Sequence, residues 1–312
     1  MIVRREKKNG IEILYVNKIK TEKEMEKIKN TLLKKNSIPH IITKDTDVYT
    51  DDNKLLLKFR KKKLPQGIVS TFYDNVINFA KKTYSTNRGS SSGSKKKNIR
   101  DNPKIYSNIL GYIDGFSPKQ KYLLKAQNKT PKYNVRETRF NSIYPDKFKQ
   151  LIPFIQEVDS NYKKYIPMQY SKQIKKANQT HFRIPKTAFT TVTTNVNFQT
   201  SIHKDRGDDP EGFGNLTVIE NNDYGGAETC LPQYGIGVDV RTGDVLFMNV
   251  HEWHGNLPME KKNKDTLRLS IVCYLRYNVW KNTLKITKSE MNKHNKTIKN
   301  IKKQKTKIKN KK

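Results

Sequence analysis

The second half of the chain is divided into short β-rich runs, and this pattern constrains the fold more than any other feature. Six or more short strands with turn signals between them are typical of a β-sandwich or barrel. The runs are separated by Gly, Asn, Asp and Pro and cover residues 190–197, 215–220, 227–231, 236–240, 245–250 and 268–277. We therefore predict an α+β fold whose core is a double-stranded β-helix, or jelly roll, with N-terminal helices packed on it.

The first half of the chain has mostly helical patterns, and such helices need a sheet to cover. Residues 21–36 predict an amphipathic helix that begins with a capping box at Thr21–Glu24. Residues 146–165 are also helical in pattern, but Pro153 within them predicts two helices rather than one. Residues 85–104 are rich in Ser, Gly, Lys and Asn, which predicts a loop.

We divide the chain into three parts. Residues 1–40 are predicted to form an N-terminal extension. Residues 41–280 form one catalytic unit, with helical support in 41–188 and the β-helix core in 189–280. Residues 281–312 contain thirteen lysines and one glutamate. Burial cannot offset the entropy of ordering such a segment, so we predict a tail that is disordered or conditionally helical. Two interpretations of the tail remain open: a solvated terminus, and a polyanion tether or nuclear import signal.

The formal net charge of the chain is +34, which is extreme for its 312 residues. The positive charges of such a protein repel one another and attract polyanions. We therefore predict nucleic acid as its partner, and DNA in preference to RNA. A second interpretation is a biased genome, because AT-rich codons raise Lys, Asn and Ile together without selection for function.

The two cysteines and the short apolar runs indicate the cellular compartment in which the protein works. Cys230 and Cys273 each lie in an apolar, strand-like run, which predicts free thiols in a reducing, intracellular environment. No apolar run approaches the roughly 20 residues needed to cross a bilayer, and the start of the chain lacks the apolar segment of a secretory signal. We predict a soluble protein without a membrane partner; nuclear and cytoplasmic locations are not separated.

Three residues have the chemistry of an iron site. His203 and Asp205 are two residues apart just after a predicted strand, so in an extended chain both side chains leave the same face. His254 follows the run at 245–250, where a jelly roll brings it back across the barrel mouth. Two imidazoles and one carboxylate can hold Fe(II) and leave positions open, as non-haem oxygenases require. His251 is a rival for the position of third ligand. Alternatively, His251 supports the His254 ligand without contacting the metal itself. The alternative to an iron site is that both histidines are structural, with hydrogen bonds to the backbone and no metal.

The last strong run begins with a pair of residues that can hold a carboxylate. Arg268 and Ser270 lie on one face of an extended strand, about 6–7 Å apart. A guanidinium can grip a carboxylate through two parallel hydrogen bonds, and a hydroxyl adds a third. An oxygenase that uses 2-oxoglutarate needs this for the distal carboxylate of its co-substrate. A surface arginine paired with an acid is the alternative, but the apolar residues around Arg268 predict a buried strand.

These residues together resemble the oxygenase domain of the TET/JBP family, the Fe(II)- and 2-oxoglutarate-dependent dioxygenases that oxidise the methyl group of 5-methylcytosine or thymine in nucleic acid. The matching motifs are residues 198–208, 212–216, 234–240, 243–247, 251–256 and 268–272. The resemblance implies His203, Asp205 and His254 as catalytic iron ligands and Arg268 with Ser270 as the 2-oxoglutarate clamp. It also implies that Asp208 contacts the target base, for which a turn role in an Asp-rich loop is the alternative.

The predicted function is therefore hydroxylation of the 5-methyl group of a pyrimidine in nucleic acid, with dioxygen and 2-oxoglutarate as co-substrates. Two alternatives remain open: a prolyl or lysyl hydroxylase of the same superfamily, and a basic nucleic-acid-binding relic without catalysis. Sequence alone does not separate cytosine from thymine, DNA from RNA, one oxidation step from several, or one oligomeric state from another.

Overall fold

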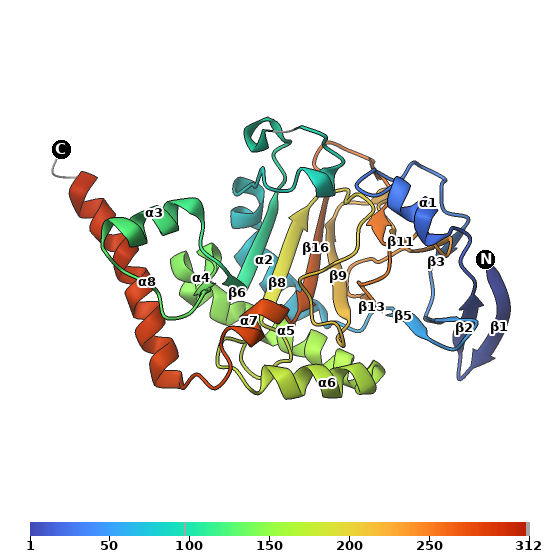
Figure 1. The fold of residues 1–312 in the computed structure, drawn as a ribbon. Helices are drawn as coiled ribbons and strands as arrows, with labels where there is room; N and C mark the ends of the chain where they lie inside the picture. Colours follow the sequence, from blue (N-terminus) through green and yellow to red (C-terminus); the bar gives the residue numbers. More distant parts are fainter. Residues whose placement is uncertain (97, 310–312) are drawn as a thin grey trace.

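A ten-stranded sheet forms the centre of the computed structural model, which describes residues 1–96 and 98–309 (Figure 1). Its strands, in spatial order, are β1 (Ile2–Lys8), β2 (Ile11–Val16), β4 (Thr46–Thr50), β5 (Leu55–Arg60), β13 (Val245–Met248), β9 (Gly214–Asn221), β16 (Leu267–Tyr274), β8 (Thr191–Val196), β6 (Ser107–Asp114) and β7 (Val135–Glu137). Most neighbours pair antiparallel, whereas β2 and β4 are parallel. Strands distant in sequence therefore meet at the centre of the sheet.

A smaller sheet faces the large one. It consists of β14 (Gly255–Asn256), β11 (Thr229–Leu231), β12 (Ile236–Val238) and β3 (His40–Ile42), and a separate ribbon pairs β10 (Tyr224–Gly226) with β15 (Met259–Lys261). Apolar side chains from both sheets form one core cluster, with Leu216, Leu246 and Met248 on one side and Leu231 and Val238 on the other. Two facing sheets around one core are the predicted double-stranded β-helix, so the fold prediction is confirmed.

Helices cover the other face of the large sheet. The rings of Phe72 of α2 and Phe154 of α5 pack against each other with centroids 4.3 Å apart, and both belong to the core cluster beneath the sheet. The helices are α1 (Glu22–Lys27), α2 (Gln66–Lys82), α3 (Pro118–Ala126), α4 (Arg139–Ile143), α5 (Pro145–Tyr165), α6 (Pro167–Ala177), α7 (Tyr277–Lys281) and α8 (Lys288–Lys309). In the part of the chain that the structure describes, no helix is long and apolar enough to cross a membrane.

Side chains along β16 point alternately to the two faces of the large sheet, toward the covering helices on one side and toward the site on the other. Leu267, Leu269, Ile271 and Cys273 belong to the core under α2 and α5, as expected for side chains that point to the same face. The intervening residues line a cavity on the opposite face: Arg268, Ser270, Val272 and Tyr274. The period of two predicted for this strand is thus confirmed, and it places the polar pair of the strand inside the β-helix.

The N-terminal region differs from its prediction in two ways. Part of the predicted extension 1–40 joins the large sheet through β1 and β2. The helix predicted for 21–36 has its capping box at Thr21 but ends with Lys27. Beyond α1 the chain pairs with Ile202 instead, because the amide of Asn30 donates to the Ile202 carbonyl at 2.8 Å. Tertiary pairing therefore replaces the last turns of the expected helix.

The break predicted at Pro153 is wrong, because α5 continues through this residue. Proline inside a helix costs about 3 kcal/mol. Leu151, Phe154, Ile155 and Val158 are all buried against the sheet and α2. Each such side chain contributes about 1.5–3 kcal/mol when buried, so together they outweigh the local cost.

Of the two states predicted for residues 281–312, disorder is wrong for most of the described part, because α7 ends within it and the helix α8 follows. Thr287 and Glu290 form reciprocal hydrogen bonds that cap the start of α8. His294 and Ile298 are buried, and α8 lies beside α3 at one end of the molecule (Figure 1). The predicted loop at 85–104 contains two single-turn 3₁₀ helices, η1 (Ser90–Ser92) and η2 (Ile99–Asp101), among its described residues.

Candidate metal and co-substrate site

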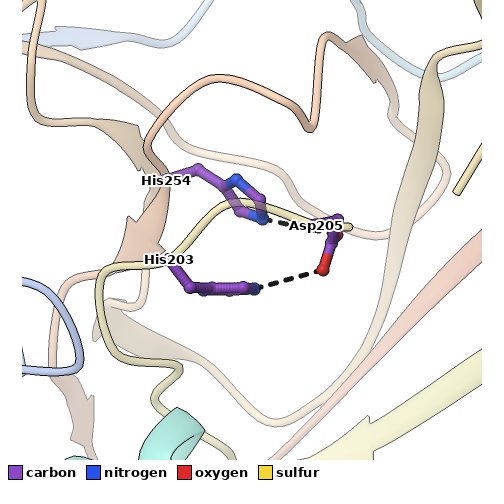
Figure 2. Close-up of side chains that lie close together, drawn as sticks. All are labelled: His203, Asp205 and His254. Carbon is purple, nitrogen blue, oxygen red and sulfur yellow. Dashed lines mark ion pairs between the residues drawn. The ribbon is translucent and has the colours of Figure 1, made fainter. Parts of the chain in front are cut away.

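The predicted triad converges at the mouth of the β-helix. His203 Nε2 lies 3.5 Å from one carboxylate oxygen of Asp205, and His254 Nε2 lies 3.5 Å from the other (Figure 2). One donor atom of each residue lies within 4.8 Å of the other two. The backbone brings the histidines together, because each amide donates to the carbonyl of the other at 2.9 Å. Asp205 is held similarly through its amide, which donates to Val250 at 2.9 Å.

The second nitrogen of each imidazole determines which atom faces the centre. His203 Nδ1 lies 2.7 Å from the Ser201 carbonyl, and His254 Nδ1 lies 2.9 Å from the Glu252 carbonyl. A carbonyl only accepts, so Nδ1 carries the proton in each ring and Nε2 keeps its lone pair. This arrangement of backbone carbonyl, imidazole and metal position is common in metalloproteins.

The charge balance of the triad favours an added positive charge. Burial would raise the pKa of the Asp205 carboxyl, but hydrogen bonds to both imidazoles and their charge hold that pKa below its ordinary value. Burial would lower the pKa of His203, but the Asp205 carboxylate reverses this and raises it. A divalent cation among the three donors supplies the same positive charge. The donor set therefore fits Fe(II), for which two histidines and one carboxylate are a known ligand set.

His251, the rival ligand, points away from this centre. Its Nδ1 lies 2.9 Å from the backbone carbonyl of Asp205, and its Nε2 lies 3.1 Å from that of Asp209. Both ring nitrogens thus contact the loop that carries Asp205. The structure places His254 in the donor cluster and His251 outside it.

Arg268 lies in the same cavity as the triad and lacks an acidic partner. Only 3% of the residue is exposed, and its Nε has no hydrogen-bond partner in the described chain. No carboxylate of the described residues lies within ion-pair distance of its guanidinium. Burial raises the pKa of Tyr224, and the positive charge of Arg268 partly opposes this rise. A buried guanidinium without an anion is costly, so the cavity is built to receive one.

Ser270 and the rest of the lining complete this cavity, which has a volume of about 200 Å³. The Asn195 amide donates to Ser270 Oγ at 3.3 Å. Four further polar side chains line the cavity: Arg88, Thr193, Thr229 and Asn256. Asn256 lies in the motif at 251–256 and Arg88 lies in the predicted loop, whereas Thr193 and Thr229 are ordinary polar residues within strands.

Asp208 lines the same cavity as the triad and Arg268. Its backbone forms a bridge with Arg276, whose side chain pairs with Asp114. Burial, followed by the charge of Asp205, raises the pKa of Asp208 well above its ordinary value. The amide of Tyr277 donates to the Gly207 carbonyl at 2.9 Å, which ties the Asp208 loop to the end of β16. Asp208 is therefore held in place as a polar group of the cavity that the triad lines.

Comparison with known proteins identifies relatives for this arrangement. The family model for the oxygenase domain of the 2OGFeDO superfamily, Tet_JBP, matches residues 123–277. The bifunctional helicase and thymine dioxygenase JBP2 of Leishmania major is 31% identical over 168 residues, or 54% of this chain and 14% of that protein. Thymine dioxygenase JBP1 of Trypanosoma brucei brucei is 32% identical over 143 residues, or 45% of this chain and 17% of that protein. The chain thus spans less than a fifth of these two relatives.

A solved structure agrees in fold. The structure of NgTET1 in complex with 5mC DNA superimposes with a TM-score of 0.50, covering 89% of this chain and 100% of that one at 13% sequence identity. At this identity the likeness concerns the fold. It shows that the two sheets and their helical cover are arranged as they are in that protein.

Proposed function

The chain belongs to the Tet/JBP family of 2-oxoglutarate- and Fe(II)-dependent oxygenases, and on that basis we propose that it hydroxylates the 5-methyl group of a pyrimidine in nucleic acid. One observation carries the proposal: the three donors of the triad and the unpaired Arg268 guanidinium line one small cavity. The substrate class comes from the relatives, because one is named a thymine dioxygenase and the other was solved in complex with 5mC DNA.

In the proposed roles, His203, His254 and Asp205 hold Fe(II), each histidine through Nε2. Arg268 and Ser270 bind the distal carboxylate of 2-oxoglutarate, the guanidinium by paired hydrogen bonds and the hydroxyl by a third. The bound iron and its co-substrate supply the oxidising chemistry, in which dioxygen gives one oxygen atom to a C–H bond and one to succinate. The balanced reaction is base methyl plus 2-oxoglutarate plus dioxygen, giving hydroxymethyl, succinate and carbon dioxide.

Asp208 is proposed to contact the edge of the target base. As a carboxylate it accepts from the exocyclic amine of cytosine, and as an acid it donates to the carbonyl that thymine carries at that position. A base within a duplex does not reach a cavity of about 200 Å³. The target nucleotide is therefore proposed to be flipped out or to lie in a single strand.

Turnover with defined substrates tests the proposal. The iron-loaded protein is incubated with 2-oxoglutarate and DNA that contains either 5-methylcytosine or thymine, and both succinate and the oxidised bases are measured by mass spectrometry. We expect succinate and hydroxymethylated base in equal amounts with at least one DNA. RNA of the same sequence separates the two nucleic acids.

A collagen-like peptide and a lysine-rich peptide are the comparison substrates. Release of succinate with a peptide, together with none above background for every nucleic acid, would replace the proposal with a protein hydroxylase. Asp208→Asn is the variant for base contact. It preserves the shape of the side chain and should alter the ratio of cytosine to thymine products more than the rate of 2-oxoglutarate turnover without substrate.

A further inference from the structure

A second hollow beside the catalytic cavity is lined by four lysines. It has a volume of about 530 Å³ and lies between the end of α2, the start of β6 and the turn that joins β15 to β16. We call it the lysine pocket, after its residues Lys81, Lys104, Lys261 and Lys264. Among its described lining residues, Asp265 is the sole acidic one.

The four lysines are not neutralised by the protein. In the described chain, none of them has a carboxylate within ion-pair distance. The acids nearby are paired with other lysines, since Asp223 binds Lys262 and Glu260 binds Lys35 at 2.7 Å. The four ammonium groups repel one another and the carboxylate of Asp265 can balance only one of them, so the hollow favours an anion.

Aromatic rings extend the lysine pocket at the surface. Tyr106 lines it and is 36% exposed, and Tyr84, 48% exposed, lies edge-on to Tyr106 with ring centroids 6.2 Å apart. Lys104 Nζ lies 5.1 Å from the centre of the Tyr84 ring. Lysines beside exposed aromatic rings are the combination by which proteins bind single-stranded nucleic acid, because the rings stack on bases and the lysines contact phosphates.

The lysine pocket adjoins the catalytic cavity. Phe198 lines both hollows. The preceding residue, Asn197, accepts from the Arg268 amide at 2.7 Å and donates to the Thr266 carbonyl at 3.2 Å. The segment that borders both hollows is thus anchored to the strand that carries Arg268.

We propose that the lysine pocket binds the phosphates next to the target nucleotide and that Tyr106 stacks on a neighbouring base. This inference rests on the proposed function. It adds the path that the nucleic-acid strand follows once the target base is in the cavity. Phosphates fit better than the dicarboxylate co-substrate, because the catalytic cavity has its own guanidinium for that anion.

The test compares two pairs of lysine substitutions in the full-length protein. Lys261→Gln with Lys264→Gln removes two charges from the lysine pocket, and Lys7→Gln with Lys8→Gln removes two from β1, at the opposite edge of the large sheet. Binding of a fluorescent single-stranded oligonucleotide is measured by anisotropy over a series of salt concentrations. Each lost phosphate contact lowers the slope of log K against log salt by about 0.7.

We expect the slope to fall by about 1.4 for the pocket pair and to stay within error of the parent for the β1 pair. Equal losses in both pairs would show a general effect of net charge and overturn the proposal, as would an unchanged slope in the pocket pair. A raised KM for 2-oxoglutarate with unchanged oligonucleotide binding would assign the pocket to the dicarboxylate and overturn it too.

Tyr106→Ala tests the stacking contact, with Tyr122→Ala, a 72% exposed tyrosine of α3, as its control. We expect Tyr106→Ala to weaken oligonucleotide binding by roughly five- to hundredfold and to leave the salt slope unchanged. These binding assays need no turnover, so they separate this proposal from the proposed reaction. A parent that binds DNA through the pocket but oxidises no base would contradict the reaction alone.

Discussion

Replacing Arg268 with methionine removes the one charge on which binding of the co-substrate is proposed to depend. Arg268 is 3% exposed and its Nε has no partner in the described chain. Methionine has a similar length, is flexible enough to fill the space, and carries no charge. The substitution therefore tests one interaction with little change in volume.

Two opposite effects follow from the structure. Without ligand, the buried guanidinium loses hydration and gains no ion pair, so Arg268→Met should leave the free energy of unfolding unchanged or raise it. With ligand, the substitution removes charged hydrogen bonds to a carboxylate in a buried cavity, which costs about 2–5 kcal/mol. This corresponds to 2-oxoglutarate binding that is roughly thirtyfold to several thousandfold weaker.

Arg60→Met is the matched control. Arg60 is also 3% exposed, but its guanidinium lies 2.6 Å from the buried carboxylate of Asp47. Its removal leaves Asp47 with Lys58, at 3.1 Å, as the remaining partner. Breaking a buried pair in this way costs about 3–5 kcal/mol, and Lys58 should keep the loss near the lower limit.

Thermal unfolding with and without 2-oxoglutarate, in the presence of Mn²⁺ in place of Fe(II), measures both quantities, and calorimetry gives the affinity. The parent should gain stability from the ligand, Arg268→Met should lose most of this gain, and Arg60→Met should keep the gain but unfold at lower temperature. Parent-like affinity in Arg268→Met, or destabilisation as large as that of Arg60→Met, would refute the reasoning.

Three further predictions concern other parts of the chain. Asp205→Ala should abolish turnover and weaken Mn²⁺ binding at least tenfold by calorimetry while the far-ultraviolet circular dichroism stays unchanged; parent-like metal binding would reject the ligand role. Deletion of residues 288–312 should weaken DNA binding and lower its salt slope, which anisotropy measures, and an unchanged slope would leave the segment without a binding role. Burial lowers the pKa of His294 from 6.5, so the folded chain binds fewer protons than the unfolded one. Docking of α8 should therefore be complete above pH 6.5 and weaken as the pH falls below it, and His294→Gln should remove this dependence in hydrogen exchange of α8.

Local periodicity accounts for what the sequence could predict of the site. His203 and Asp205 share a face because they are two residues apart, and Arg268 and Ser270 do so for the same reason. The choice of His254 over His251 depends on more distant contacts. His254 is fixed by backbone hydrogen bonds to His203, fifty-one positions earlier, and no local pattern encodes that pairing.

The wrong predictions have a common physical cause. In α8 the lysines dominate the composition, but burial of His294 and Ile298 against residues of β7 and α3 depends on surfaces that lie far away in sequence. At Pro153 a local rule was outweighed by burial of a whole helical face. In both cases tertiary packing supplied free energy that no window of residues contains.

The sequence also does not reveal which buried charges have a partner. In this protein, that property distinguishes an arginine with a proposed functional role from one with a structural role. Arg60 and Arg268 both lie in strands of the large sheet and are equally buried. Arg60 meets Asp47 from the neighbouring strand β4, so its charge is satisfied within the fold. Arg268 pairs in register with Glu220 of β9, but that carboxylate approaches Thr242 and Arg241 instead. Because the acid nearest in register is engaged elsewhere, the guanidinium is left for an anion from outside the chain.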